Sequence, residues 1–250
     1  RRLSPAVSLS WRPFSESTLR IRASYKDIFR VPTFTDLYYL RMGNTNLKPE
    51  ETSQYNVGVT WSSSCGDWLR HFSISADGYY NTVKDKIVAL PTMYVWKMMN
   101  MGEVDIKGVD VNLSTQFRLP LRMSLLLAST YSFQYAVDVT DPEAKNYKDQ
   151  IPYTPRHSGT VSVTLENPWV NVSYILTAVG DRYALPQNID RNRIDSYIEQ
   201  SISINRDFRF RYFGLRLQGE LLNLANVNYD VIQYYPMPGR SWRLSICLSY

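Results

Sequence analysis

Apolar and polar side chains alternate with a period of two residues from one end of this 250-residue chain to the other. In the last segment Trp242, Leu244 and Ile246 fall on one face, whereas Arg243 and Ser245 fall on the other. Successive side chains of a β-strand point to opposite faces, so the pattern predicts strands with one apolar and one polar face. We expect eleven strands and no helix, with the strands near residues 7–12, 19–26, 55–61, 72–81, 109–117, 121–134, 160–165, 170–177, 194–205, 213–221 and 241–250.

The connections between these segments alternate between short turns and long loops. Short turns are expected at 13–16, 63–67, 119–120, 167–168 and 206–207, and long connections at 27–50, 88–102, 136–155, 182–192 and 226–240. Outer-membrane barrels have short periplasmic turns and long extracellular loops. Four of the six Trp residues lie beside short turns, as residues of a membrane interface do. The pattern predicts an all-β, transmembrane antiparallel β-barrel; the alternative is a soluble β-sandwich that hides one face of each sheet.

Composition excludes several other classes of protein. The apolar runs, such as 125–128, are far shorter than the roughly 18 to 20 residues of a transmembrane helix. Two Cys and two His exclude a disulfide scaffold and most metal clusters, and we expect Cys65 and Cys247 to be free thiols. The net charge of +5 is spread along the chain without a cluster of basic residues, so no nucleic-acid partner is expected. Neither His71 nor His157 lies beside a nucleophile or suits a haem ligand, so no enzyme, catalytic residue, metal site or cofactor is expected.

The number of strands indicates that they do not close a barrel alone. If the last strand ends on the periplasmic side, an odd number of alternating strands makes the first strand run in the same direction. Single-chain bacterial barrels are antiparallel with an even strand number, and each unpaired backbone group facing hydrocarbon costs several kcal/mol. We therefore expect further strands, on an N-terminal portion outside this chain, to complete a wider barrel.

Six short motifs are spread along the chain. They read YKDIFRVPTFTDLY at 25–38, GNTNLKPE at 43–50, IKGVD at 106–110, TPRH at 154–157, NLANVNY at 223–229 and PGR at 238–240. These motifs resemble those of TonB-dependent outer-membrane receptors. Val31 and Thr45 stand where the family usually has Ala and Pro. The resemblance implies that residues 1–250 form the C-terminal half of a 22-stranded barrel. Its plug domain and N-terminal barrel half would lie outside this chain.

The resemblance also implies a function and a set of partners. Such a receptor sits in the Gram-negative outer membrane among lipid and lipopolysaccharide, captures cobalamin, a ferric siderophore or a similar bulky nutrient at its extracellular loops, and imports it with energy from the TonB complex. A glycan or peptide importer with a surface lipoprotein partner is the second alternative. A passive porin, which would lack a plug, and a structural or adhesive barrel, which would show no saturable uptake, are further alternatives.

Candidate ligand-binding residues lie in the long loops, because flexible thioethers and flat rings adapt to an irregular ligand. The densest cluster lies between Pro91 and Met101, and packing of one loop against another is the alternative interpretation. The motifs at 30–33 and 44–50 are expected to form a loop scaffold, since Pro and Asn restrict the chain locally. The candidates are Met93, Tyr94, Trp96, Met98 and Met99, together with Tyr38, Tyr39, Arg41, Tyr183, Asn188, Tyr234 and Tyr235.

Overall fold

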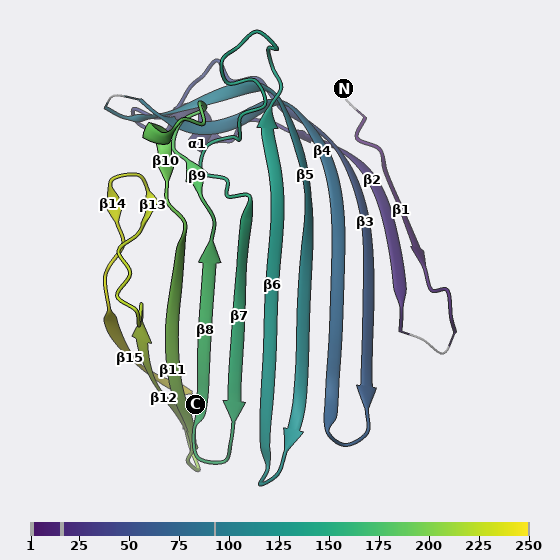
Figure 1. The fold of residues 1–250 in the computed structure, drawn as a ribbon, viewed down its shortest axis with the longest axis vertical. Coiled ribbons are helices and arrows are strands. Elements are labelled where there is room, and N and C mark those ends of the chain that lie inside the picture. Colours follow the sequence, from purple (N-terminus) through teal and green to yellow (C-terminus); the bar gives the residue numbers. More distant parts are fainter. Residues whose placement is uncertain (1–2, 16–17, 93, 250) are drawn as a thin grey trace.

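The protein folds into one large antiparallel sheet of eleven strands, in which neighbours along the chain lie side by side (Figure 1). The computed structural model describes residues 3–15, 18–92 and 94–249. Across the sheet the strands are β1 (Ala6–Trp11), β2 (Arg20–Arg30), β3 (Glu50–Cys65), β4 (Leu69–Pro91), β5 (Trp96–Leu119), β6 (Met123–Asp138), β7 (His157–Glu166), β8 (Asn171–Val179), β11 (Tyr197–Arg209), β12 (Gly214–Leu222) and β15 (Ser241–Ser249). The eleven predicted strands are confirmed.

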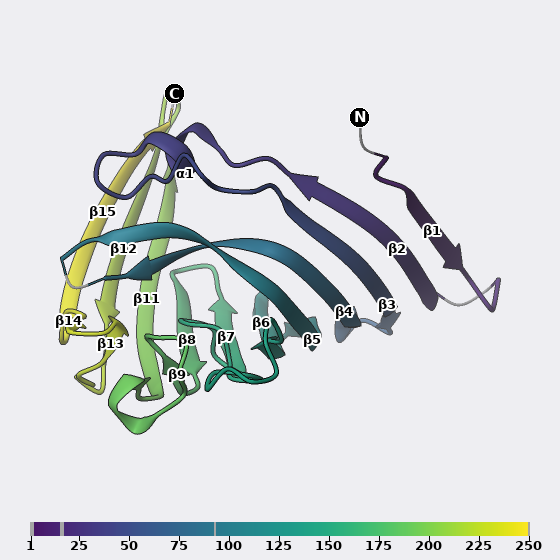
Figure 2. The same ribbon diagram turned by 90° about the horizontal axis from the view of Figure 1, so that it is seen from above.

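The sheet is curved and open. Viewed from above, it follows an arc with β1 and β15 at its two ends, and the concave side is free of further sheet layers (Figure 2). In the described residues β1 pairs only with β2, and β15 pairs only with β12. No helix in this part of the chain is long and apolar enough to cross a membrane.

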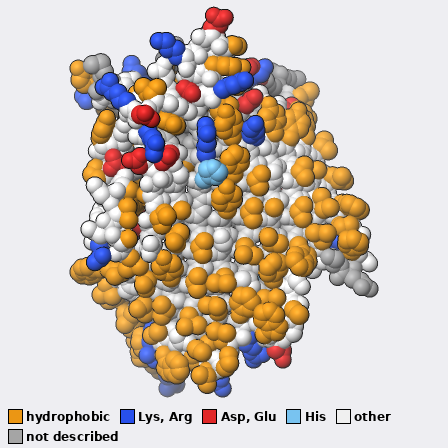
Figure 3. Space-filling model, in the orientation of Figure 1, with side chains coloured by type: hydrophobic (Ala, Val, Ile, Leu, Met, Phe, Trp, Pro, Cys, Tyr) orange, Lys and Arg blue, Asp and Glu red, His pale blue; other side chains and the backbone are white. Residues whose placement is uncertain are grey.

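The two faces of the sheet differ in chemistry as the alternation predicts. The convex face is covered with apolar side chains over most of its height, and charged side chains gather at one end (Figure 3). On the polar face, ion pairs join different strands, two of them between neighbouring strands and one, Arg22–Asp77, from β2 to β4 across Gly58 of β3. They are Arg22–Asp77 at 2.9 Å, Arg216–Asp207 at 2.6 Å and Arg243–Glu220. Charged side chains on this face are thus paired across strands.

Short turns lie at one end of the strands and long connections at the other, as expected (Figure 1). We call these the short-turn end and the long-loop end. The long connections contain structure that the sequence did not predict: helix α1 (Phe34–Tyr38), the 3-10 helix η1 (Asp190–Asn192), and two small hairpins. The hairpins pair β9 (Arg182–Tyr183) with β10 (Arg193–Ile194), and β13 (Asp230–Ile232) with β14 (Tyr235–Pro236). The expectation of no helix is therefore wrong, although both helices are very short.

The prediction of a loop at 88–102 is also wrong, because β4 and β5 continue through almost all of this segment. The two strands run to 23 and 24 residues and stay paired up to Pro91 and Trp96. Two strands of a hairpin satisfy each other's backbone groups, so they can extend beyond the rest of the sheet. Figure 2 shows this end of the hairpin bending over the concave side. We call residues 85–102 the arch.

A small apolar core lies at the foot of the arch. Its buried members come from the upper parts of β4, β5 and β6 and from the connection between β6 and β7. They are Val83, Met101, Val104, Ile106, Ala136 and Ile151. This core fixes the base of the arch to the sheet and removes Met101 from the residues available to a ligand.

Candidate functional site

The arch is bound along its length to the connection between β2 and β3, which carries two of the sequence motifs. Asn44 Nδ2 donates to the Met98 carbonyl at 3.1 Å, and the Met98 amide donates to the Met42 carbonyl at 2.9 Å. Asn100 Oδ1 accepts from the Lys48 amide at 2.8 Å, while its Nδ2 donates to the Lys48 and Asp85 carbonyls. This connection, residues 31–49, therefore acts as a strap that holds the arch over the concave side.

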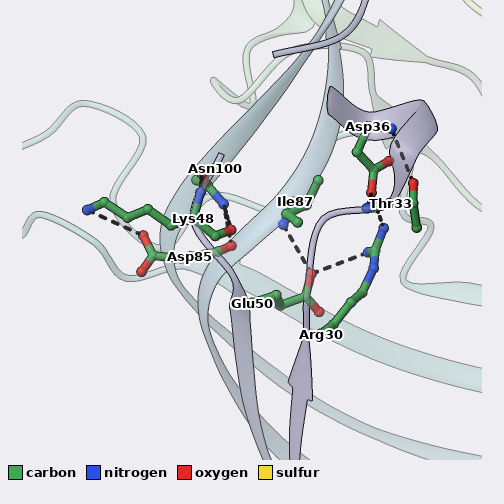
Figure 4. A network of polar contacts seen from close by, with 8 residues as sticks. All are labelled: Arg30, Thr33, Asp36, Lys48, Glu50, Asp85, Ile87 and Asn100. Carbon is green, nitrogen blue, oxygen red and sulfur yellow. Dashed lines mark hydrogen bonds and ion pairs between the residues drawn. The ribbon is translucent and has the colours of Figure 1, made fainter. Parts of the chain in front are cut away.

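A second set of contacts lies where the strap leaves β2 and enters β3 (Figure 4). The Arg30 guanidinium pairs with Asp36 at 2.9 Å and with Glu50 at 3.5 Å. Glu50 Oε2 also accepts the Ile87 amide at 3.1 Å. Arg30 and Glu50 thus join the two ends of the strap to each other and to the arch, as expected of a scaffold.

Helix α1 is stabilised at its N-terminus by two reciprocal hydrogen bonds between Thr33 and Asp36. The Thr33 hydroxyl accepts the Asp36 amide at 3.2 Å, and the Asp36 carboxylate accepts the Thr33 amide at 2.9 Å, which forms a capping box. Burial opposes ionisation of Asp36, but hydrogen bonds from Thr33 and the Arg30 guanidinium outweigh it and hold the Asp36 pKa below its ordinary value. Gly43 packs against the end of the helix, where a Cβ would lie 2.5 Å from the Leu37 carbonyl oxygen.

Aromatic side chains join the arch to the other long connections. Trp96 packs on Tyr153 with ring centroids 5.6 Å apart, and the Tyr153 amide donates to the Tyr183 carbonyl at 2.7 Å. The Asn188 amide donates to the Asp149 carboxylate at 3.0 Å. Three connections that are distant in sequence therefore form one continuous cap at the long-loop end.

The last long connection is held by a buried arginine and two stacked tyrosines. Arg182, which is 4% exposed, donates to the Asp230 and Val231 carbonyls and lies 5.5 Å from the Tyr197 ring centroid. Tyr197 stacks on Tyr229 at 4.0 Å, and the Tyr229 hydroxyl donates to Glu199 at 2.7 Å. Burial and then the hydrogen bond to Glu199 raise the pKa of Tyr229, so its hydroxyl stays protonated and keeps donating.

The predicted ligand-binding residues divide into two groups in this cap. Trp96, Met98, Tyr183 and Asn188 are half-buried and support contacts between loops. The others face solvent, apart from Met93, which lies outside the described residues. The exposed ones are Tyr38, Tyr39, Arg41, Tyr94, Met99, Tyr234 and Tyr235, with Tyr94 exposed to 90% at the tip of the arch. Their role in binding stays a prediction.

Several residues that organise this end were missed from the sequence. Tyr153, Arg182, Tyr197 and Tyr229 come from separate segments, and only the fold brings their side chains together. The one available signal was Tyr229 at the end of the motif at 223–229. In that motif Asn223 is 2% exposed, and its side chain binds both the Val227 amide and the Val227 carbonyl at 2.8 Å.

The arrangement offers surfaces for binding. Among the described residues, no group of three His, Cys, Asp or Glu side chains could hold a metal ion. Cys65 and Cys247 are free and exposed. His157 lies on the convex face, where its Nδ1 is 2.9 Å from the Tyr131 hydroxyl. The cap therefore presents to a ligand a set of exposed aromatic rings and a thioether, on loops that the strap holds in place.

Comparison with known proteins identifies the architecture. The family model described as "TonB dependent receptor-like, beta-barrel" matches residues 1–224. The chain belongs to this family. Members are outer-membrane transporters and receptors, and the predicted family and outer-membrane location are confirmed.

Curated relatives of this TonB-dependent receptor chain include two transporters of vitamin B12. The vitamin B12 transporter BtuB of Photobacterium profundum is 27% identical over 236 residues, which are 90% of this chain and 34% of that protein. BtuB of Vibrio vulnificus is 24% identical over 221 residues, covering 86% of this chain and 32% of that protein. The chain thus spans about a third of the length of these relatives.

Solved structures of the family share the fold of this chain at low sequence identity. The copper transporter OprC superposes with a TM-score of 0.73 at 17% identity, covering 98% of this chain and 38% of OprC. BauA, the ferric preacinetobactin receptor of Acinetobacter baumannii, superposes with a TM-score of 0.70 at 13% identity, covering 98% of this chain and 36% of BauA. Because the matched family is one of outer-membrane β-barrels, the apolar convex face of the sheet is the face that contacts lipid.

Proposed function

We propose that this chain is the C-terminal half of a 22-stranded receptor barrel that captures cobalamin or an iron chelate at its long-loop end. Import would draw energy from the TonB complex through a plug domain outside this chain. Nutrient import across the outer membrane follows from the family. The identity of the cargo and the energy coupling are the proposed parts.

The cap at the long-loop end is the observation that carries this proposal. It is held rigidly from below, by the strap and by the stacked tyrosines, yet it presents exposed aromatic rings and the thioether of Met99, which is 44% exposed. Rings and thioethers provide contact area for a bulky, irregular ligand. A preorganised but exposed surface of this kind fits capture of a ligand from the medium, because the loops lose little conformational entropy when the ligand binds.

The experiment is uptake by cells that make the full-length receptor, using labelled cobalamin, a panel of ferric siderophores and haem. We expect saturable uptake of a cobalamin or an iron chelate, which stops when the inner-membrane proton gradient is dissipated. Uptake that is linear in concentration and independent of that gradient would instead indicate a passive porin. Uptake of oligosaccharides or peptides alone, dependent on a surface lipoprotein, would establish the other importer class.

A pair of exposed tyrosines tests whether the tip of the arch contacts the cargo. Tyr94 is 90% exposed at this tip, and Tyr212 is 79% exposed in a turn at the opposite end of the sheet. Tyr94→Ala combined with Met99→Ala should weaken capture about tenfold, as expected for losing one well-packed aromatic contact. Tyr212→Ala should leave capture unchanged. If the arch variant and the parent bind the cargo with equal affinity, the arch is not part of the binding site.

A further inference from the structure

Two sequence motifs that the cap does not use meet at one aromatic ring on the convex face. Lys107, in the motif at 106–110, is directly opposite Tyr135 in the register of β5 and β6, and its Nζ lies 5.1 Å from the ring centroid. Arg156, in the motif at 154–157, places its guanidinium carbon 5.2 Å from the same centroid. Each cation is attracted to the ring. The two cations repel each other, so their arrangement suits an anion that contacts both.

Neither cation is neutralised within the described part of the chain. The ion pairs of the described residues include Lys84 with Glu103 and Lys48 with Asp85, but none involves Lys107 or Arg156. Asp105, two residues from Lys107 along β5, forms no ion pair with it there. Arg156 uses its Nε to donate to Gln150 Oε1 at 2.8 Å, which fixes the guanidinium and leaves its outer nitrogens to other partners. Both side chains are exposed.

The position of Tyr135 on the convex face points to a lipid headgroup. Tyr25, Tyr55, Tyr80, Lys107 and Tyr135 are successive cross-strand partners from β2 to β6, so they form one row across the sheet. Ring contacts of 5.0 Å and 6.4 Å join the first three. A row of aromatic residues between an apolar band and polar loops marks the membrane interface in barrels of this kind.

The apolar band begins directly toward the short-turn end of this row. Figure 3 shows apolar side chains over this part of the convex face and basic side chains at its long-loop margin. Lys107 and Arg156 therefore lie at the depth where the charged groups of lipids meet the protein wall. They face lipid and not the concave side, where cargo is expected to pass.

We propose that Lys107, Arg156 and Tyr135 form a binding site for a phosphate group of an outer-leaflet lipid. Arginine offers a planar fork of donors that matches phosphate oxygens, and lysine adds a compact positive charge. Tyr135 holds both cations in place and provides an apolar edge for the start of an acyl chain. The site is independent of the cargo, because it lies on the opposite face of the sheet.

The experiment measures lipid binding to the full-length receptor in detergent, by native mass spectrometry and by lipid phosphorus per barrel. The double variant Lys107→Gln, Arg156→Gln should bind diphosphoryl lipid A about tenfold less tightly or worse, the loss expected for removing hydrogen bonds from charged donors. Its binding of the dephosphorylated lipid should equal that of the parent. Lys148→Gln is the matched control, because Lys148 also lies over a tyrosine ring, 5.2 Å from Tyr147, but in a loop at the long-loop end.

A second variant separates loss of charge from loss of structure. Lys107→Arg combined with Arg156→Lys keeps both charges and should restore most of the binding. Equal binding of diphosphoryl lipid A by the parent and the glutamine variant would overturn the proposal. Full displacement of the lipid by inorganic phosphate would also overturn it, because the site would then recognise a free anion. So would a glutamine variant that loses binding of the dephosphorylated lipid as much as binding of diphosphoryl lipid A, because the contact would then be a general apolar one.

Discussion

Asp36 is the side chain on which the order of the strap depends most directly. Replacing it by alanine removes two hydrogen bonds, one accepted from the Thr33 amide and one from Arg30, each at 2.9 Å. The first contributes about 1.5 kcal/mol, the lower end of the range for a hydrogen bond to a charged group, because Asp36 is ionised. The second is discounted to roughly 0.5–1 kcal/mol, because the Arg30 side chain is 43% exposed. Local opening of the strap should become easier by about 2 kcal/mol.

Amide hydrogen exchange of the full-length receptor in detergent measures this opening. The amides of Leu37, Gly43 and Asn44 are bound within the strap, the last two at 2.7 and 2.9 Å. A change of about 2 kcal/mol should speed their exchange about 30-fold in Asp36→Ala, since 1.4 kcal/mol corresponds to a factor of ten. Asp36→Asn should have a smaller effect, because the amide oxygen still accepts from Thr33.

The matched control for this prediction is Asp141→Ala. Asp141 also accepts a nearby amide, that of Glu143 at 2.9 Å, in the connection between β6 and β7. This variant should speed exchange only around its own turn and leave residues 31–47 unchanged. An acceleration of less than about threefold in Asp36→Ala would refute the assignment of Asp36 as the anchor of the strap.

The charges of the strap and the lipid-facing wall each give a further prediction. Because the Asp36 pKa is lowered in the folded strap, its contribution is fully present above the unfolded value of about 3.9 and is lost as the pH falls through the lower folded value. Amide exchange at residues 31–47 is corrected for its intrinsic rate. In the parent it should be constant from about pH 7 to 5 and rise below about pH 4, whereas Asp36→Ala should show no such rise. A rise in the parent that begins above about pH 5 would contradict this. Val57 lies on the convex face between the rings of Tyr55 and Trp61, so Val57→Arg should lower the unfolding free energy in lipid vesicles by about 2–4 kcal/mol. Asn56→Arg, on the polar face, should cost less than about 1 kcal/mol, and equal costs for the two would show that the faces are assigned incorrectly.

The strands were predictable because a wall between lipid and a polar interior imposes a strict two-residue period. The period disappears where the wall leaves the membrane, which is why the arch was expected to be a loop although β4 and β5 remain paired through it. Helix α1 spans five residues, too few for a helical period. Its only sequence signal was Thr33 followed three residues later by Asp36, with Pro32 before them.

The candidate site was predictable in composition but not in arrangement. Rings and thioethers in long connections indicated a binding surface, and the exposed Tyr94 and Tyr234 fit that expectation. Whether a given ring faces solvent or supports a neighbouring loop depends on contacts between distant segments. The pairing of Trp96 with Tyr153 is such a contact, and no local pattern in the sequence encodes it.

The placement of the anchors along the arch has a consequence for how such receptors diversify. The bonds from Glu50, Lys48 and Asn44 fall at Ile87, Asn100 and Met98, all below the tip, to which Thr92, Tyr94 and Val95 belong. Substitutions in the tip are therefore separated from the residues that anchor the arch. With the nutrient bound at the tip, as proposed above, selection can change the tip to fit a new nutrient while the anchored part below it remains as it is.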